Sequence, residues 1–72
     1  MTNTVMLEKV ISDSGIKKGH LAMLVGINSY TLAMKINNER EFKASEIDTL
    51  CKILNIDVNN RMRIFFAAEV DF

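Results

Sequence analysis

The chain has 72 residues, of which 49% are hydrophobic, with no proline and a formal net charge of zero. A chain of this size buries about 60% of the surface that its unfolded form exposes, so residues 1–72 are predicted to form one small domain, and a second domain is excluded. The longest apolar runs are far shorter than the roughly eighteen residues of a membrane span. MTNTVMLEKV lacks the basic start and apolar stretch of a signal peptide, so we expect a cytoplasmic protein.

The zero net charge hides a gradient along the chain. Residues 1–15 hold one basic and two acidic residues, residues 16–43 hold five and two, and residues 44–72 hold three and five. Affinity for nucleic acid grows with the number of phosphates that a protein neutralises. The net charge of +3 in the middle segment is therefore small for a protein that must hold DNA by itself, although a dimer would double it.

The first predicted helix covers about Val5–Ser14. Its apolar residues recur three and four positions apart and share one face, namely Leu7, Val10 and Ile11. Thr4 is its predicted N-cap, and Gly15 fits the left-handed position that often follows a helix.

A helix-turn-helix is predicted next, over about residues 17–37. Its first helix covers Lys18–Val25 and buries Leu21, Ala22 and Val25. Gly26 ends this helix, Ile27 enters the core, and Asn28 is a preferred N-cap residue. The next helix therefore starts within about three residues, a spacing that is typical of this motif.

The second helix of the motif is predicted over Ser29–Asn37. Leu32 and Ile36, one turn apart, anchor it in the core. At about 100° per residue, a neighbouring arc of the helix faces outward and consists of Ser29, Tyr30, Ala33, Met34 and Asn37.

Two more helices are predicted after a polar loop, residues 38–43, in which Phe42 is expected to plug the core. The fourth helix covers about residues 44–54 with an apolar stripe of Ala44, Ile47, Leu50, Cys51 and Leu54. Asp57 caps a fifth helix from Val58 to about Ala68, which has an apolar side of Met62, Phe65 and Phe66. A short tail completes the segment 57–72, and an exposed phenylalanine in this helix would favour a dimer contact.

Three stretches of this chain resemble the lambda-repressor-like, Cro/CI-type helix-turn-helix family of phage and bacterial regulators. They are HLAMLVGINSYTL (residues 20–32), INNEREF (36–42) and ASEIDTLCKIL (44–54). The glycine and small-residue positions, the buried turn isoleucine and the fourth-helix pattern all agree with one fold. The resemblance covers about residues 11–56 and implies an all-α, five-helix domain.

Within this family, the short length, FKASEI and the IFFA ending are most similar to the modulators of repression, or antirepressors, of temperate lactococcal phages. This resemblance implies a regulator of the lysis or lysogeny switch. Such a protein binds the N-terminal helix-turn-helix domain of the phage CI repressor and blocks or alters its DNA binding.

The motif departs from DNA-binding members of the family in two places. Its first helix begins with Lys17, Lys18 and Gly19, where such members often have a capping hydroxyl and a glutamine. The outward arc of its second helix has no arginine or glutamine for bidentate base contacts. Tyr30 and Met34 instead resemble the centre of a protein interface, although they are also compatible with ordinary surface residues or with contact to a thymine methyl group.

The alternative function is a Cro-like dimer that reads operator DNA. Phosphates would then be held by Lys17, Lys18, Lys35, Arg40 and Lys43, while Ser29, Tyr30 and Asn37 would approach bases. A hybrid, in which the chain and the repressor occupy DNA together, stays open. For either partner, the candidate contact residues are His20, Asn28, Ser29, Tyr30, Ala33, Met34, Asn37, Glu39, Arg40 and Glu41.

Glu39 and Glu41 follow the second helix of the motif, where DNA binders usually meet phosphate. Their charge would be repelled by DNA but would pair with the lysines or arginines of a repressor's DNA-binding face. The alternative is that both glutamates belong to an ordinary solvated loop, because Lys35, Arg40 and Lys43 nearby can neutralise them.

No motif predicts catalysis, a cofactor, a metal site or a small-molecule substrate. His20 has no second ligand at metal-binding spacing. Cys51 falls in the buried stripe of the fourth helix without a matching base, so it is expected to be a small core residue.

Overall fold

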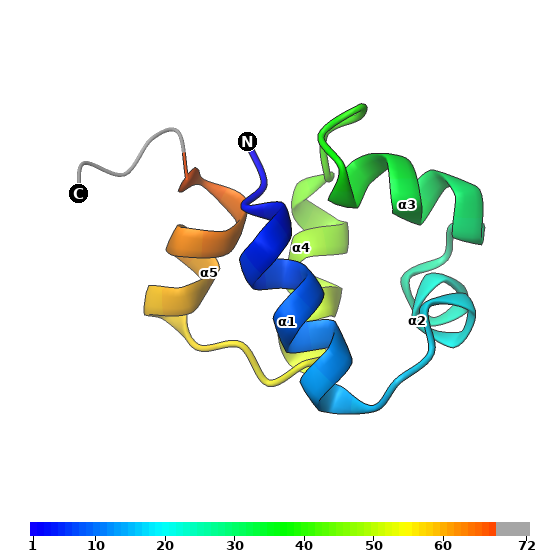
Figure 1. The fold of residues 1–72 in the computed structure, drawn as a ribbon, viewed down its shortest axis with the longest axis horizontal. Helices are drawn as coiled ribbons and strands as arrows, with labels where there is room; N and C mark the ends of the chain where they lie inside the picture. Colours follow the sequence, from blue (N-terminus) through cyan, green and yellow to red (C-terminus); the bar gives the residue numbers. More distant parts are fainter. Residues whose placement is uncertain (68–72) are drawn as a thin grey trace.

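The computed structural model describes residues 1–67, which form five helices and no strand (Figure 1). The helices are α1 Thr4–Ser14, α2 Lys18–Val25, α3 Ser29–Ile36, α4 Ala44–Ile53 and α5 Val58–Phe65. The predicted all-α, five-helix fold is confirmed. Over residues 1–67, no helix has the length and hydrophobicity needed to cross a membrane.

The core consists of side chains from all five helices. It is formed by Leu7, Ile11, Leu21, Ala22, Leu32, Ile36, Ile47, Leu50, Cys51, Leu54, Ile64 and Phe65. Phe42 is partly buried at its edge and packs edge-to-face on Phe65, with the ring centroids 5.4 Å apart. The loop after α3 is thus anchored in the core, as predicted.

Two predictions about apolar faces are wrong. Ala44 is exposed, because it is the first residue of α4 and precedes the part of that helix that packs on the core. On α5 the inward pair is Ile64 and Phe65, while Met62 is 43% exposed and Phe66 is only half-buried. The carbonyl oxygen of Ile64 accepts a hydrogen bond from the Asn3 backbone N–H at 2.6 Å, so this part of α5 lies beside the segment that precedes α1.

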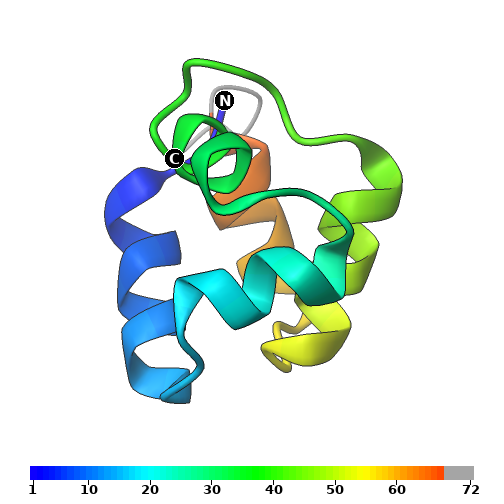
Figure 2. The same cartoon turned by 90° about the vertical axis from the view of Figure 1, so that its right-hand side faces the viewer.

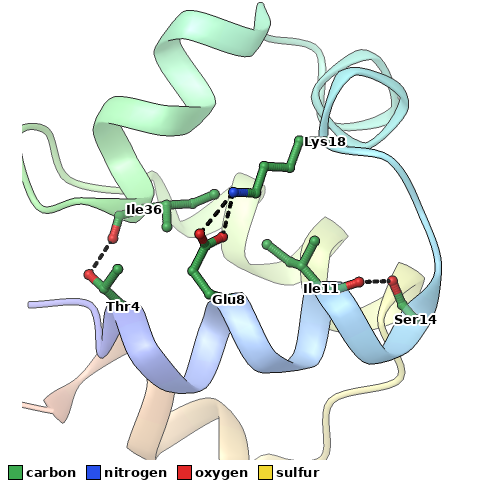
Figure 3. Close-up of polar contacts among 6 residues, drawn as sticks. All are labelled: Thr4, Glu8, Ile11, Ser14, Lys18 and Ile36. Carbon is green, nitrogen blue, oxygen red and sulfur yellow. Dashed lines mark hydrogen bonds and ion pairs between the residues drawn. The ribbon is translucent and has the colours of Figure 1, made fainter.

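The start of α1 also differs from the prediction. Its N-cap is Asn3, whose Oδ1 accepts a hydrogen bond from the Met6 backbone N–H at 3.1 Å. Thr4 is instead the first helical residue, and its hydroxyl donates to the Ile36 carbonyl oxygen at 2.6 Å (Figure 3). At the other end Gly15 has φ of 74°, the left-handed value that was expected.

The helix-turn-helix consists of α2, a short turn and α3. In Figure 2 α2 crosses the front of the molecule and α3 is seen nearly end-on, so their axes cross steeply. Gly26 has φ of 90°, and the N–H groups of Gly26 and Ile27 both donate to the Ala22 carbonyl, at 2.9 and 3.0 Å. Asn28 Oδ1 accepts from the Thr31 backbone N–H at 2.7 Å, which confirms the predicted cap.

The last three helices are shorter than predicted. Both α3 and α4 end one residue early, and Asn37 is the C-cap of α3. The α5 helix ends at Phe65, whereas its predicted end near Ala68 lies outside the described residues.

Gly26→Ala is expected to lower the unfolding free energy by about 1–2 kcal/mol, because an L side chain is strained at this positive φ. Gly19→Ala is the matched control. Gly19 lies inside α2, and an added Cβ would make only an ordinary 3.6 Å contact with Ser29 Oγ, so alanine is expected to leave stability unchanged or raise it by up to about 1 kcal/mol. Urea unfolding measures both changes, and equal losses in the two variants would contradict this account.

Candidate functional site

The exposed side of the helix-turn-helix lies at one end of the molecule, opposite α5 (Figure 1). We call this surface the outer face and define it by exposed residues of α3 and the loop that follows. They are Ser29, Tyr30, Ala33, Asn37, Glu39, Arg40 and Glu41. Most of the predicted contact residues are therefore exposed on α3 or on the loop that follows it.

Tyr30 is the most prominent side chain of this surface. It lies in the first turn of α3 and is 72% exposed, which leaves most of its ring available to a partner. Ala33 lies one turn further along and is exposed too. This part of the outer face is apolar and carries the Tyr30 hydroxyl as a polar handle.

Two other predicted contact residues have structural roles. Met34 is half-buried, so only part of its side chain faces outward. Asn28 is exposed, but its side-chain oxygen already accepts the capping hydrogen bond from Thr31. His20, by contrast, is exposed on α2 as expected.

Lys35 was predicted to contact phosphate, and that prediction is wrong. The residue is only 5% exposed, and its Nζ donates to Glu46 Oε1 on α4 at 2.5 Å. The same Glu46 oxygen accepts a hydrogen bond from the Lys43 backbone N–H at 2.8 Å, which satisfies the start of α4. The charge of Lys35 is therefore used inside the fold to join α3 to α4.

Burial alone would raise the pKa of the Glu46 carboxyl. The hydrogen bonds from Lys35 and from the Lys43 backbone, together with the positive charge of Lys35, outweigh burial and hold this pKa below its ordinary value of 4.5. A carboxylate with a lowered pKa stabilises the folded state above the pKa that it has when unfolded.

The unfolding free energy is accordingly expected to fall as the pH drops below about 5 and through the folded-state pKa of Glu46. Hydrogen bonds from Lys52 and Arg61 also lower the pKa of Asp48, which adds a loss of the same sign. Urea unfolding between about pH 3 and about pH 7 measures the total effect. Glu46→Gln should flatten this profile, and an unchanged slope in that variant would contradict the role given to Glu46.

The profile of the Cro/C1-type HTH DNA-binding domain matches residues 6–59, three quarters of the chain. The chain belongs to this family. Searches of curated proteins and of solved structures each found no match. The family is one of DNA-binding transcription regulators and is generally non-enzymatic, and its helix-turn-helix corresponds to α2 and α3.

The exposed charge of this Cro/C1-type domain is small on the side of its helix-turn-helix. Lys35 is neutralised by Glu46, and Lys18 forms a half-exposed ion pair with Glu8 at 2.8 Å (Figure 3). The other exposed charged residues of the helix-turn-helix and the loop after it are Lys17, Arg40 and Lys43 against Glu39 and Glu41, a net charge of +1. Phosphate binding by one copy of the domain is therefore expected to be weak.

Sequence reasoning missed two features of this Cro/C1-type domain. Leu24 is 45% exposed on α2 beside Met23, which is 65% exposed. The segment that precedes α1 contacts the loop after α3 through Asn38, and no local pattern signals this contact.

Other reactive groups of the Cro/C1-type domain lie away from the outer face. Cys51 is buried in the core, and burial raises the pKa of its thiol, which disfavours the reactive thiolate. Within residues 1–67, no three side chains of metal-binding type come together.

Proposed function

We propose that this domain is an antirepressor, or modulator of repression, in the lysis or lysogeny switch of a temperate phage. In this proposal its outer face binds the N-terminal helix-turn-helix domain of the phage CI repressor. The bound repressor domain is then blocked from operator DNA or binds it differently.

The observation that carries the proposal is that α3 buries its basic side chain and exposes its aromatic one. Its one basic residue, Lys35, is buried in an ion pair, while the aromatic Tyr30 is exposed. Protein interfaces are enriched in tyrosine and depleted of lysine at their centres. Base reading relies on arginine, lysine, asparagine or glutamine aimed at base edges, and within α3 itself the one residue of these types is the buried Lys35.

The charges of the loop support the same partner. Glu39 and Glu41 are exposed immediately after α3. A repressor's DNA-binding face carries the basic residues that normally meet phosphate, so these carboxylates complement it. Complementary charge at the rim speeds association and fixes the orientation of the two proteins.

A Cro-like dimer that represses transcription from operator DNA is the second candidate, and membership of a DNA-binding family favours it. In that function Lys17, Arg40 and Lys43, which are exposed, contact phosphates. Lys18 would first have to leave Glu8, and Lys35 is no longer a candidate because it is buried.

Titration of the purified protein against repressor, against switch-region DNA, and against both together separates the two candidates. Each titration is run at two salt concentrations, because phosphate contacts give affinity a steep salt dependence. The antirepressor function predicts binding to the repressor and a change in the repressor's operator complex. Tight, salt-sensitive binding to operator DNA with no binding to repressor would support the Cro-like function instead.

A further inference from the structure

The segment before α1 is tied to the end of α3 by a pair of reciprocal hydrogen bonds. The backbone N–H of Thr2 donates to Asn38 Oδ1 at 2.7 Å, and Asn38 Nδ2 donates back to the Thr2 carbonyl oxygen at 2.8 Å. The Thr4 hydroxyl also donates to the Ile36 carbonyl (Figure 3). We call these contacts of Thr2 and Thr4 with residues 36–38 the clamp.

The clamp depends on a particular backbone conformation at Asn38. This residue has φ of 65°, in the left-handed region, and asparagine tolerates that region better than most residues. Its side chain is thereby placed to bond both polar groups of residue 2. Thr2 is buried while Asn38 is exposed, so these bonds are partly shielded from competing water.

The other end of the loop is held as well. Phe42 packs on Phe65, and the Lys43 N–H bonds to Glu46. Between these two anchors lies the exposed loop tip, residues 39–41. Its first residue also donates its backbone N–H to the Met34 carbonyl at 2.9 Å.

We propose that Asn38 is a positioning residue, which holds the loop tip in the shape that the partner recognises. The part of this inference that concerns binding rests on the proposed repressor-binding function. A loop that is already ordered loses less conformational entropy when it binds, so the clamp raises affinity without touching the partner. The partner that fits is a protein surface whose basic side chains meet Glu39 and Glu41.

The substitution Asn38→Gly tests this role. Glycine accepts φ of 65° without strain, so the variant removes the side-chain amide and keeps the backbone conformation. Asn55→Gly is the matched control, because Asn55 also has a positive φ, of 55°, and lies after α4. Both variants add the backbone entropy of one glycine to the unfolded chain, and only the first breaks the clamp.

Backbone NMR relaxation of residues 39–41 and the affinity for the repressor N-terminal domain are measured on the wild type and both variants. Asn38→Gly is expected to increase the fast motion of the loop tip and to weaken repressor binding about three- to tenfold. Asn55→Gly is expected to do neither. A purely structural role for Asn38 would lower the melting temperature and leave the affinity of the folded protein unchanged.

Three different results would each contradict one step of this inference. Unchanged relaxation in Asn38→Gly would show that the clamp does not order the loop tip. Increased motion with unchanged repressor affinity would show that the loop tip is not in the contact surface. A wild-type protein that does not bind repressor would remove the proposed function, while the relaxation data would still decide whether Asn38 orders the loop.

Discussion

Glu46→Leu is expected to lower the unfolding free energy by about 3–5 kcal/mol, because it leaves the buried ammonium group of Lys35 without its partner. The same change removes the acceptor of the Lys43 N–H at the start of α4. A domain of this size has little stability to spare, so the loss should be a large fraction of the total. Urea unfolding at neutral pH measures it.

The double variant Lys35→Met/Glu46→Leu is the control for this result. Replacing both members of a buried ion pair with apolar residues is often neutral or stabilising. The double variant should therefore recover most of the stability that Glu46→Leu loses, apart from the Lys43 hydrogen bond, worth about 1 kcal/mol. The unfolding free energy of Lys35→Met alone is measured too. If the loss in the double variant equals the sum of the losses in the two single variants, the two residues do not act as a pair.

Tyr30→Ala is expected to weaken binding to the repressor N-terminal domain by about 30-fold or more. Tyrosine is a frequent hot-spot residue, and a hot spot contributes at least about 2 kcal/mol to binding. The side chain is 72% exposed in the free protein, so its loss should leave the melting temperature almost unchanged. Isothermal titration calorimetry measures the affinity, and thermal unfolding checks the fold.

Val58→Ala is the matched control for this experiment. Val58 is an apolar residue that is 74% exposed, but it lies on α5, at the opposite end of the molecule from the outer face (Figure 1). Its truncation should not change repressor binding. Equal effects of Tyr30→Ala and Val58→Ala, or no effect of either, would place the contact elsewhere.

The helix-turn-helix was predictable because its signals are local. Gly26 and Asn28 act on their own helix ends, and both have the expected conformation and hydrogen bonds. The spacing of Leu32 and Ile36 likewise identified the buried side of α3. Signals of this kind involve residues at most a few positions apart, so a short stretch of sequence is enough to predict the helix ends and the buried side.

Lys35 was misplaced for a different reason. Its spacing from Leu32 already put it near the buried side of α3, but lysine is almost never fully buried unless it is paired. Its partner, Glu46, lies eleven residues away on another helix, and local spacing does not reveal the pair. A helical position that looks buried and holds a charge is better interpreted as half of a possible ion pair than as a phosphate contact.

Other missed contacts also join distant parts of the chain. Asn38 bonds to residue 2 across 36 positions, and the Ile64 carbonyl accepts a hydrogen bond from Asn3, which is far away in the sequence. The partner of the outer face is a separate molecule, so no pattern within this chain specifies it. Tyr30, Glu39 and Glu41 are exposed, so these groups are available to a partner.

The most direct test of the central claim is a map of the binding surface by NMR. Isotope-labelled protein is titrated with the unlabelled N-terminal domain of the repressor, and amide shift changes are followed for each residue. We expect the largest changes at the outer-face residues of α3 and the loop that follows, with the exposed start of α5, at Val58, unaffected. No shift changes with repressor, together with changes at these same residues on adding operator DNA, would contradict the account and identify a DNA-reading domain.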